Sequence, residues 1–191
     1  MHWKLVPICT AIVAAFVASA HSQDNTGAPG LRDAGSHSVI LMRHRDAPGD
    51  GEPASFRLAD CSTQRNLSDK GREQASALGA VLRERGIRVT KVVSSQWCRA
   101  RETAELMKIG KVEHEPAFDN LSFNKAQAKE LTERARAVIA AWQGPGVLVV
   151  VTHDSNLKAL AGADAARIGM VLADAAEGGV RFRPLALSAG H

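Results

Sequence analysis

The sequence predicts an α/β domain of three layers, in which a mainly parallel sheet lies between two layers of helices. From residue 38 onward, short apolar runs that suit buried strands alternate with amphipathic stretches that suit helices, and this alternation is typical of an α/β/α sandwich. The last two apolar runs have no helix between them, which predicts an antiparallel margin. The chain has 191 residues, of which 45% are hydrophobic and 23% charged, the size and balance of one globular domain.

The elements follow from apolar spacing and from the turn residues that bound each run. Alternating or continuous apolar runs predict strands at 38–42, 90–94, 111–115, 146–152, 168–173 and 180–187. Apolar residues at helical spacing predict helices at 68–86 and 125–142 and a short one from 156 onward. Another helix is expected after the stretch Ser95-Gln-Trp-Cys-Arg99 and runs through about residue 108. Ser68 suits the N-cap of the first helix and Gly86 its end. Glycines and prolines favour irregular loops at 45–53 and 116–124, and Gly178-Gly179 favours a hairpin.

Residues 1–20 have the pattern of a signal peptide. Lys4 precedes an apolar stretch that ends in Val-Ala-Ser-Ala20, so we expect cleavage after Ala20 and a periplasmic or secreted protein. An uncleaved membrane anchor is the alternative, but the stretch is shorter than the roughly 20 apolar residues that a spanning helix needs. Residues 21–36 are rich in Gly, Ser, Asp and Asn, which predicts a flexible tether before a folded domain over 37–191.

Charge and cysteine content narrow the possible functions. The formal net charge of +4 falls to +3 without Lys4, there is no long run of Lys and Arg, and the chain has no Tyr, so a nucleic-acid partner has little support. Cys61 and Cys98 are the cysteines that remain after the signal peptide. In an oxidising compartment such a pair predicts one disulfide, and two unpaired thiols are the alternative.

Charged side chains stand where the predicted strands end. Arg43 and His44 directly follow the first strand, and His153 follows the strand over 146–152. If these strands are parallel neighbours, both imidazoles lie on the same rim of the sheet, where open α/β sheets hold ligands. Right-handed crossovers bring Arg99, which follows another strand, to the same edge. The sequence therefore predicts a site of two arginines and two histidines.

Three motifs contain these residues, LMRHRDAP, SSQWCRARETA and VVVTHDSNLKAL, and a fourth, RNLSDKGREQA, lies between the first two. In order and spacing they resemble the histidine phosphatase superfamily over residues 38–162. The resemblance implies a phosphoglycerate mutase-like fold and hydrolysis of phosphomonoesters through a phosphohistidine, with no metal or other cofactor. The chain is especially similar to small exported members with a Gln-Trp-Cys-Arg stretch, some of which act on heptose phosphates of the lipopolysaccharide core. The implied partner is a phosphorylated small molecule or glycan, with no stable insertion into a membrane.

The resemblance also implies roles for the four residues. His44 is the nucleophile, and Arg43, Arg99 and His153 hold the phosphoryl group. Fixed cations suit this reaction because the transferring group spreads negative charge over three oxygens, and a guanidinium grips two of them at once. Neighbouring cations should keep His44 unprotonated, with one ring nitrogen free to attack and the other donating to a backbone carbonyl.

The residue that protonates the leaving group has more than one candidate. Asp154 follows His153 directly, as the general acid does in the acid phosphatase and phytase branch of the family, and we expect it to serve here. In the smaller-domain branch the acid often comes from a loop after the second strand, which offers Glu113, Glu115 and Asp119. Asp154 has a structural alternative as the N-cap of the following helix.

Two further arginines are candidates for substrate binding. Arg45 replaces the glycine that often follows Arg-His in the family, and it could extend the phosphate grip or select an acidic substrate; a solvated loop arginine is the alternative. Arg65 precedes a helix N-terminus, which suits anions, although it could equally be a surface charge.

Other functions fit the sequence less well. A metal site built from His44, His153 and Asp154 is disfavoured, because the sequence has no His-x-x-x-His or Cys-x-x-Cys spacing and the flanking arginines would oppose a dication. The remaining alternative is a catalytically silent envelope protein that uses the same pocket to bind a phosphorylated glycan or another anion.

Overall fold

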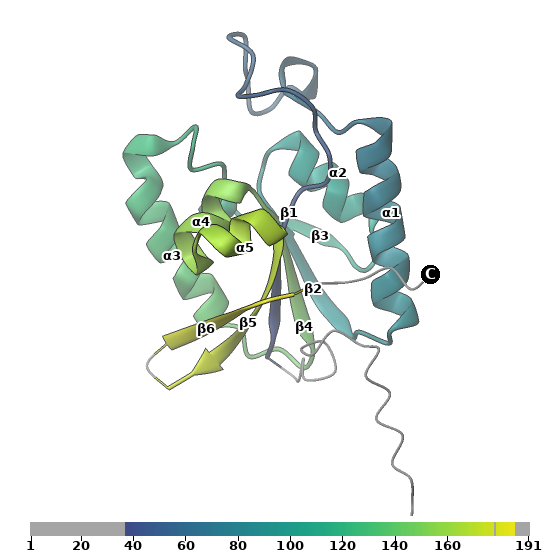
Figure 1. The fold of residues 1–191 in the computed structure, drawn as a ribbon, viewed down its shortest axis with the longest axis vertical. Helices are drawn as coiled ribbons and strands as arrows, with labels where there is room; N and C mark the ends of the chain where they lie inside the picture. The colour runs from purple at the N-terminus through teal and green to yellow at the C-terminus, as the bar shows by residue number, and fades with distance from the viewer. Residues whose placement is uncertain (1–36, 178, 186–191) are drawn as a thin grey trace, which may run out of the picture.

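A six-stranded mixed sheet forms the centre of the computed structural model, which describes residues 37–177 and 179–185 (Figure 1). The strand order is β3-β2-β4-β1-β5-β6. Four strands are parallel: β1 (Val39–Arg43), β2 (Val89–Ser94), β3 (Val112–His114) and β4 (Val147–Thr152). β5 (Met170–Ala176) and β6 (Gly179–Pro184) add the antiparallel margin. The predicted mainly parallel sheet is confirmed, whereas the predicted signal peptide (1–20) and tether (21–36) lie outside the described residues.

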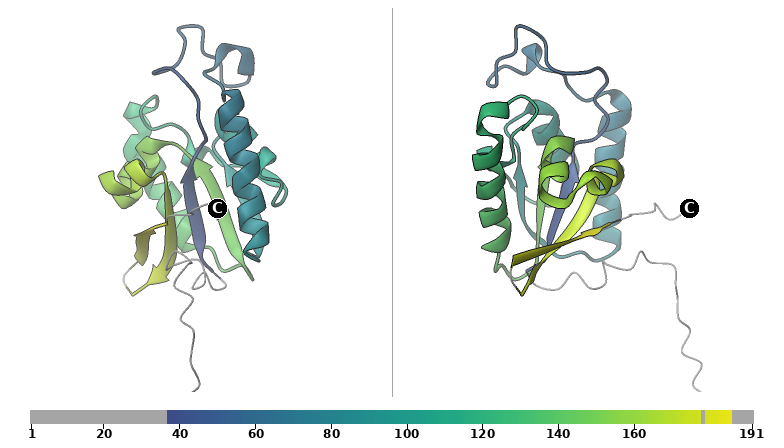
Figure 2. Two further views of the ribbon diagram at one scale, coloured as in Figure 1. Left: turned by 45° about the vertical axis from the view of Figure 1, so that its right-hand side comes forward. Right: turned by 60° about the vertical axis from the view of Figure 1, so that its left-hand side comes forward.

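Helices cover both faces of the sheet, as expected for three layers (Figure 2). α1 (Asp69–Glu84) and α2 (Cys98–Leu106) pack on one face. α3 (Ala128–Ala140), α4 (Asp154–Ala161) and α5 (Ala163–Ile168) pack on the other. Short 3-10 helices occur at Cys61–Thr63, Pro116–Phe118 and Lys125–Gln127. Within the described ranges, none of the helices has the length and apolar character needed to cross a membrane.

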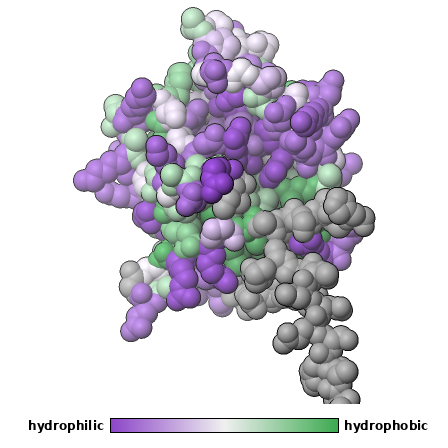
Figure 3. Space-filling model, viewed as in Figure 1, coloured by the Kyte–Doolittle hydropathy of each residue, from purple (hydrophilic) through white to green (hydrophobic). Residues whose placement is uncertain are grey.

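The central strand β1 is buried on both faces, and this explains its unbroken apolar sequence. Ile40 and Met42 pack under α1 and α2, while Val39 and Leu41 pack under α3 and α4. Figure 3 shows hydrophilic residues over most of the upper part of one face of the molecule and hydrophobic residues gathered in its middle. Burial on two sides is what holds β1, and the site residues that follow it, in a fixed position.

Two helix boundaries show how local chemistry modifies the predicted pattern. Ser68 is the N-cap of α1 as expected, and its hydroxyl accepts a hydrogen bond from the backbone N–H of Gly71. The segment expected as a loop at 116–124 begins with a 3-10 turn instead. Pro116 suits its first position, the Glu115 side chain caps it, and Phe118 anchors it in the core.

The C-terminal part of the domain differs from the prediction in several element bounds. α4 starts at Asp154 rather than near 156, and α3 starts only at Ala128, after a 3-10 turn. Residue 168 belongs to α5, so β5 begins at Met170. β6 ends at Pro184, and the backbone N–H of the next residue, Leu185, still donates to the carbonyl of Met170 at 3.0 Å. The β5–β6 hairpin is confirmed by its register, although Gly178 lies outside the described residues.

Cys61 and Cys98 form the predicted disulfide, which closes a sequence separation of 37 residues. It joins the irregular segment after β1 to the first residue of α2. Gln64 reinforces the same junction, because its side-chain oxygen accepts from the backbone N–H of Cys98 at 2.9 Å and its amide donates to the carbonyl of Leu58 at 2.8 Å. The crosslink thereby fixes a segment that has little regular structure of its own.

Replacing both cysteines by serine (C61S with C98S) should lower the free energy of unfolding by about 2–4 kcal/mol, because the unfolded chain gains the entropy that this loop closure removes. Urea unfolding followed by circular dichroism measures the change. Wild type in a thiol reductant should match the double variant, and the reductant should not affect the double variant. Equal midpoints for the oxidised wild type and the variant would contradict the prediction.

Candidate active site

Two neighbouring parallel strands bring the two histidines together. β1 pairs with β4 so that Arg43 stands opposite Thr152, and each strand is followed directly by a histidine. The backbone N–H of His44 donates to the carbonyl of Thr152 at 2.9 Å, which continues the ladder by one residue. The ring centroids of His44 and His153 lie 5.3 Å apart in an edge-on arrangement. Both imidazoles therefore share one site at the carboxyl edge of the sheet.

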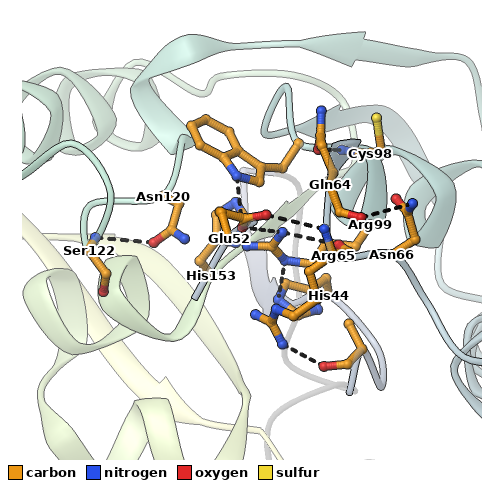
Figure 4. Close-up of polar contacts among 12 residues, drawn as sticks. His44, Glu52, Gln64, Arg65, Asn66, Cys98, Arg99, Asn120, Ser122 and His153 are labelled. Carbon is orange, nitrogen blue, oxygen red and sulfur yellow. Dashed lines mark hydrogen bonds and ion pairs between the residues drawn. The ribbon is translucent and has the colours of Figure 1, made fainter. Parts of the chain in front are cut away.

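Hydrogen bonds define the tautomer of His44. Its Nδ1 lies 2.7 Å from the carbonyl oxygen of Arg45, which can only accept, so Nδ1 carries the proton. Its Nε2 accepts from the Nε–H of Arg99 at 3.1 Å (Figure 4). Burial lowers the pKa of His44 from 6.5 to about 3, the bond to the carbonyl opposes this in part, and Arg99, Arg43 and Arg65 lower the pKa further. His44 is thus a neutral imidazole whose lone pair is on Nε2.

A buried carboxylate orients Arg99. The guanidinium is fully buried at the start of α2, and its Nη1 forms an ion pair with Glu52 Oε1 at 2.6 Å (Figure 4). Glu52 also accepts from the indole N–H of Trp97 at 3.1 Å and from the backbone N–H of Arg65 at 3.2 Å. Nη2 of Arg99 is buried and has no hydrogen-bond partner in the described part of the chain. One donor of Arg99 is therefore left for a ligand.

A hydrogen-bonded chain extends behind His153. The Ser95 hydroxyl donates to Asp119 Oδ1 at 3.1 Å, and the backbone N–H of Gln96 donates to the same oxygen at 2.8 Å. Because the Ser95 proton is used in this way, its oxygen accepts from His153 Nε2–H at 2.9 Å. Burial lowers the pKa of His153 well below 6.5, and it raises the pKa of Asp119 to about 6. His153 is neutral, and its Nδ1 is buried without a partner among residues 37–177 and 179–185.

A cavity of about 420 Å³ collects these groups. It contains six of the predicted site residues: Arg43, His44, Arg65, Arg99, His153 and Asp154. The lining residues that sequence reasoning missed include Glu52, Asn120, Ser122 and Phe123. They belong to segments without a periodic pattern, so nothing in the local sequence singles them out.

One aromatic ring, that of Phe123, lines this cavity, and the rings of Phe56 and Trp97 pack against it. Phe56 stacks on Trp97 with centroids 5.3 Å apart and contacts Phe123 at 4.6 Å. Phe123 lines the cavity and is 50% exposed, while Trp97 is buried above the ion pair of Glu52 and donates to it. The cavity thus combines several cations with one aromatic side chain, which two further aromatic rings support.

The four candidate acids occupy different places. Asp154 lines the cavity and pairs with Arg43 at 2.9 Å. Asp119 is linked to His153 through the Ser95 hydroxyl, and Glu115 caps the 3-10 turn at Pro116–Phe118. Glu113, on the edge strand β3, forms an ion pair with Lys91 at 2.9 Å. The N-cap alternative for Asp154 is wrong, because α4 begins at this residue and its N-cap position is the preceding histidine.

The two additional arginines are placed differently. Arg65 lines the main cavity, and its Nη1 donates to the carbonyls of Ala47 and Gly49. Arg45 lines a second cavity instead, and its Nε and Nη2 are buried. The solvated-loop alternative for Arg45 is therefore wrong. No group of three His, Cys, Asp or Glu side chains is arranged to hold a metal ion in the part of the chain that the structure covers.

Comparison with known proteins shows related sequences and folds. The chain is 34% identical over 91 residues to the mitochondrial serine/threonine-protein phosphatase Pgam5 of Drosophila virilis, a match that spans 48% of this chain and 25% of that protein. The chain therefore aligns with about a quarter of the length of such relatives.

Two solved structures illustrate the similarity of fold. The product of open reading frame Rv3214 from Mycobacterium tuberculosis superposes with a TM-score of 0.57 at 17% identity, over 80% of this chain and 98% of that one. A mycobacterial glucosyl-3-phosphoglycerate phosphatase superposes with a TM-score of 0.52 at 17% identity, over 80% of this chain and 99% of that one.

The sequence profile of the histidine phosphatase superfamily (branch 1) matches residues 39–148, more than half of the chain. This range includes His44, Arg65 and Arg99, and β4 then brings His153 to the same cavity. The chain belongs to the histidine phosphatase superfamily.

Proposed function

We propose that this protein is an exported, metal-independent phosphatase that hydrolyses phosphomonoesters through a phosphohistidine at His44. The observation that carries the proposal is the state of His44: its proton is held on Nδ1 by a backbone carbonyl, and its Nε2 lone pair faces the buried guanidinium of Arg99. A nucleophile and a cation for the transferring group thus adjoin each other in one cavity. The substrate class is a phosphorylated small molecule or glycan, and a heptose phosphate of the lipopolysaccharide core is the specific candidate.

In the first step, the phosphoryl group binds among Arg43, Arg65 and Arg99, with the unpartnered Nη2 of Arg99 donating to one oxygen. His153 adds a second hydrogen-bond donor once its Nδ1 is protonated. The negative charge of the bound phosphoryl group favours this protonation, because an adjacent negative charge raises the pKa of an imidazole. The hydrogen bond from Arg99 Nε–H to His44 Nε2 is exchanged for one to a phosphoryl oxygen, and the freed Nε2 lone pair attacks phosphorus. The bond to the ester oxygen breaks, and the leaving oxygen takes a proton from Asp154, which enters the step as a carboxylic acid that has taken its proton from solvent.

In the second step, water attacks the phosphorus of the phosphohistidine, and the bond between phosphorus and Nε2 breaks. The Asp154 carboxylate accepts a proton from the water, which restores the acid, and inorganic phosphate leaves. Asp154 is proposed for this role because, of the four candidate acids, it alone lines the cavity. Its partner Arg43 also lines the cavity, so a bound phosphate would compete for Arg43 and free Asp154 for proton transfer.

Replacing His44 by alanine should reduce the hydrolysis of p-nitrophenyl phosphate by more than about 10³-fold, because no other group can take up the phosphoryl. Assays with EDTA present test the metal-independent mechanism at the same time. His114→Ala is the matched control, since His114 is an exposed histidine on β3 outside the cavity. An active His44→Ala enzyme overturns the assignment, loss of activity with chelator indicates a metal enzyme, and phosphate binding without turnover in wild type indicates the silent anion-binding protein.

Replacing Asp154 by asparagine should slow the hydrolysis of alkyl phosphates by about 10²-fold or more and that of p-nitrophenyl phosphate much less, because nitrophenolate leaves without a proton. The measurement is kcat for a series of leaving groups. Asp69→Asn, which removes an almost fully exposed carboxylate, should leave the series unchanged. Equal losses across the series would assign Asp154 a structural role.

The imidazole of His44 should stay neutral throughout the neutral and mildly acidic range, because burial and nearby arginines lower its pKa to about 3. Nuclear magnetic resonance of the ring C–H signals between pH 8 and 4 should show no titration of His44 above pH 5. In Arg99→Gln the pKa should rise, since one of the cations that lower it is gone. A His44 signal that titrates near pH 6.5 in wild type contradicts this account of the nucleophile.

A further inference from the structure

A second cavity, of about 220 Å³, adjoins the nucleophile. It shares Arg43 and His44 with the main cavity, and Arg45, Asp46, Gln74 and Arg167 also line it. Nothing in the reaction described above uses this space. A ligand that places its phosphoryl group at His44 can therefore extend into it without leaving the site.

Arg45 is the uncompensated cation of this cavity. Arg43 is paired with Asp154 at 2.9 Å, and Arg167 with Asp164 at 3.1 Å. Nε and Nη2 of Arg45 are buried with no acceptor in the described residues, although the Arg45 side chain lines the cavity. Asp46 lines the cavity as well and accepts a hydrogen bond from Ser68, but in the described residues its carboxylate forms no ion pair with Arg45.

This arrangement is costly for a protein without a ligand, because a buried charge needs a partner to offset the loss of hydration. Burial, and then the nearby charge of Arg43, lower the pKa of Arg45 from its ordinary value, which reflects the same lack of compensation. Nε and Nη2 are adjacent donors on one edge of the guanidinium. That edge matches two oxygens of a phosphate or a carboxylate. Such an anion would supply the hydrogen-bond acceptors that Nε and Nη2 lack in the described residues.

The backbone of Arg45 fixes where such an anion would lie. Its N–H donates to Thr103 Oγ1 of α2 at 3.1 Å, and its carbonyl accepts from His44 Nδ1 at 2.7 Å. One residue therefore holds the nucleophile through its main chain and faces the second cavity with its side chain. The distance between the two anion positions is set by a rigid part of the fold.

We propose that the second cavity binds a second anionic group, a phosphate or a carboxylate, on the substrate whose phosphoryl group is transferred to His44. The preferred substrates are thus phosphomonoesters with two anionic groups close together. This inference rests on the proposed phosphatase function and adds the substrate class. Arg45 supplies the recognition, and Arg43 lies between the two positions and contributes to both.

Calorimetric binding of non-hydrolysable ligands tests this proposal independently of turnover. Bisphosphonates joined by one, two or three methylene groups, and the corresponding phosphonocarboxylates, are compared with simple alkyl phosphonates. We call the bisphosphonates and phosphonocarboxylates linked dianions, because each joins two anionic groups. At least one linked dianion should bind wild type about tenfold or more tightly than its monophosphonate, which is the gain in affinity expected for hydrogen bonds to a charged group. The comparison of the two series shows whether phosphate or carboxylate is preferred.

The affinity of the linked dianion relative to its monophosphonate should fall to about twofold or less in Arg45→Gln. In Arg45→Lys this ratio should be intermediate, because lysine keeps the charge but loses the paired donors. Arg88→Gln is the control, because Arg88 is exposed beside the opposite end of β2, and it should keep the wild-type ratio. Melting temperatures establish that each variant is folded.

Three results overturn the proposal. The first is that no bisphosphonate or phosphonocarboxylate binds wild type better than its monophosphonate, and the second is that the tighter binding survives in Arg45→Gln. The third is that free phosphate raises the affinity for a monophosphonate as much as the covalently attached second anion does. The last result would mean a separate anion rather than a second group on the substrate. If the linked dianions show the Arg45-dependent advantage but wild type hydrolyses no phosphomonoester, the proposed function fails and the second anion site stands.

Discussion

The ion pair between Glu52 and Arg99 is the interaction on which the rest of the site depends. Both side chains are almost completely removed from solvent, at 2% and 0% exposure, so each would carry a large desolvation cost without the other. Hydrogen bonds from Trp97 and from the backbone of Arg65 complete the coordination of the carboxylate. The pair fixes the rotation of the guanidinium, and this rotation presents Nε to His44 and leaves Nη2 without a partner among the residues that the structure describes.

This ion pair joins two parts of the chain that have no ladder or helix packing in common. Glu52 belongs to the irregular segment after β1, and Arg99 to the first turn of α2. The disulfide between Cys61 and Cys98 ties the same two parts together beside the pair, and the hydrogen bond from Cys98 to Gln64 supports it. A chain with this crosslink suits an oxidising compartment, which agrees with the proposal of export. The site is therefore built as much by covalent and ionic links as by the sheet.

The sequence predicts the strands that position the site, because burial of an element requires a recognisable pattern of apolar residues. The apolar runs before His44 and His153 are continuous because β1 and β4 are covered on both faces, and parallel pairing then brings both histidines to one edge. The disulfide follows from cysteine parity. Glu52 and the link from Ser95 to Asp119 could not be predicted, because their partners are distant in sequence and their segments follow no periodic pattern. Arg45 stood out as a departure from a motif, but only the fold shows that Nε and Nη2 of its guanidinium are buried.

The aromatic cluster beside the cavity has a consequence for how the charges act. Trp97 and Phe56 pack against Phe123, which lines the cavity, and this apolar volume next to the cations lowers the local dielectric constant on that side. Coulombic attraction there is stronger than between exposed charges, and mobile counterions reach it less easily. Anion affinity at this site should accordingly depend less on ionic strength than affinity that arises from arginines spread over an open surface.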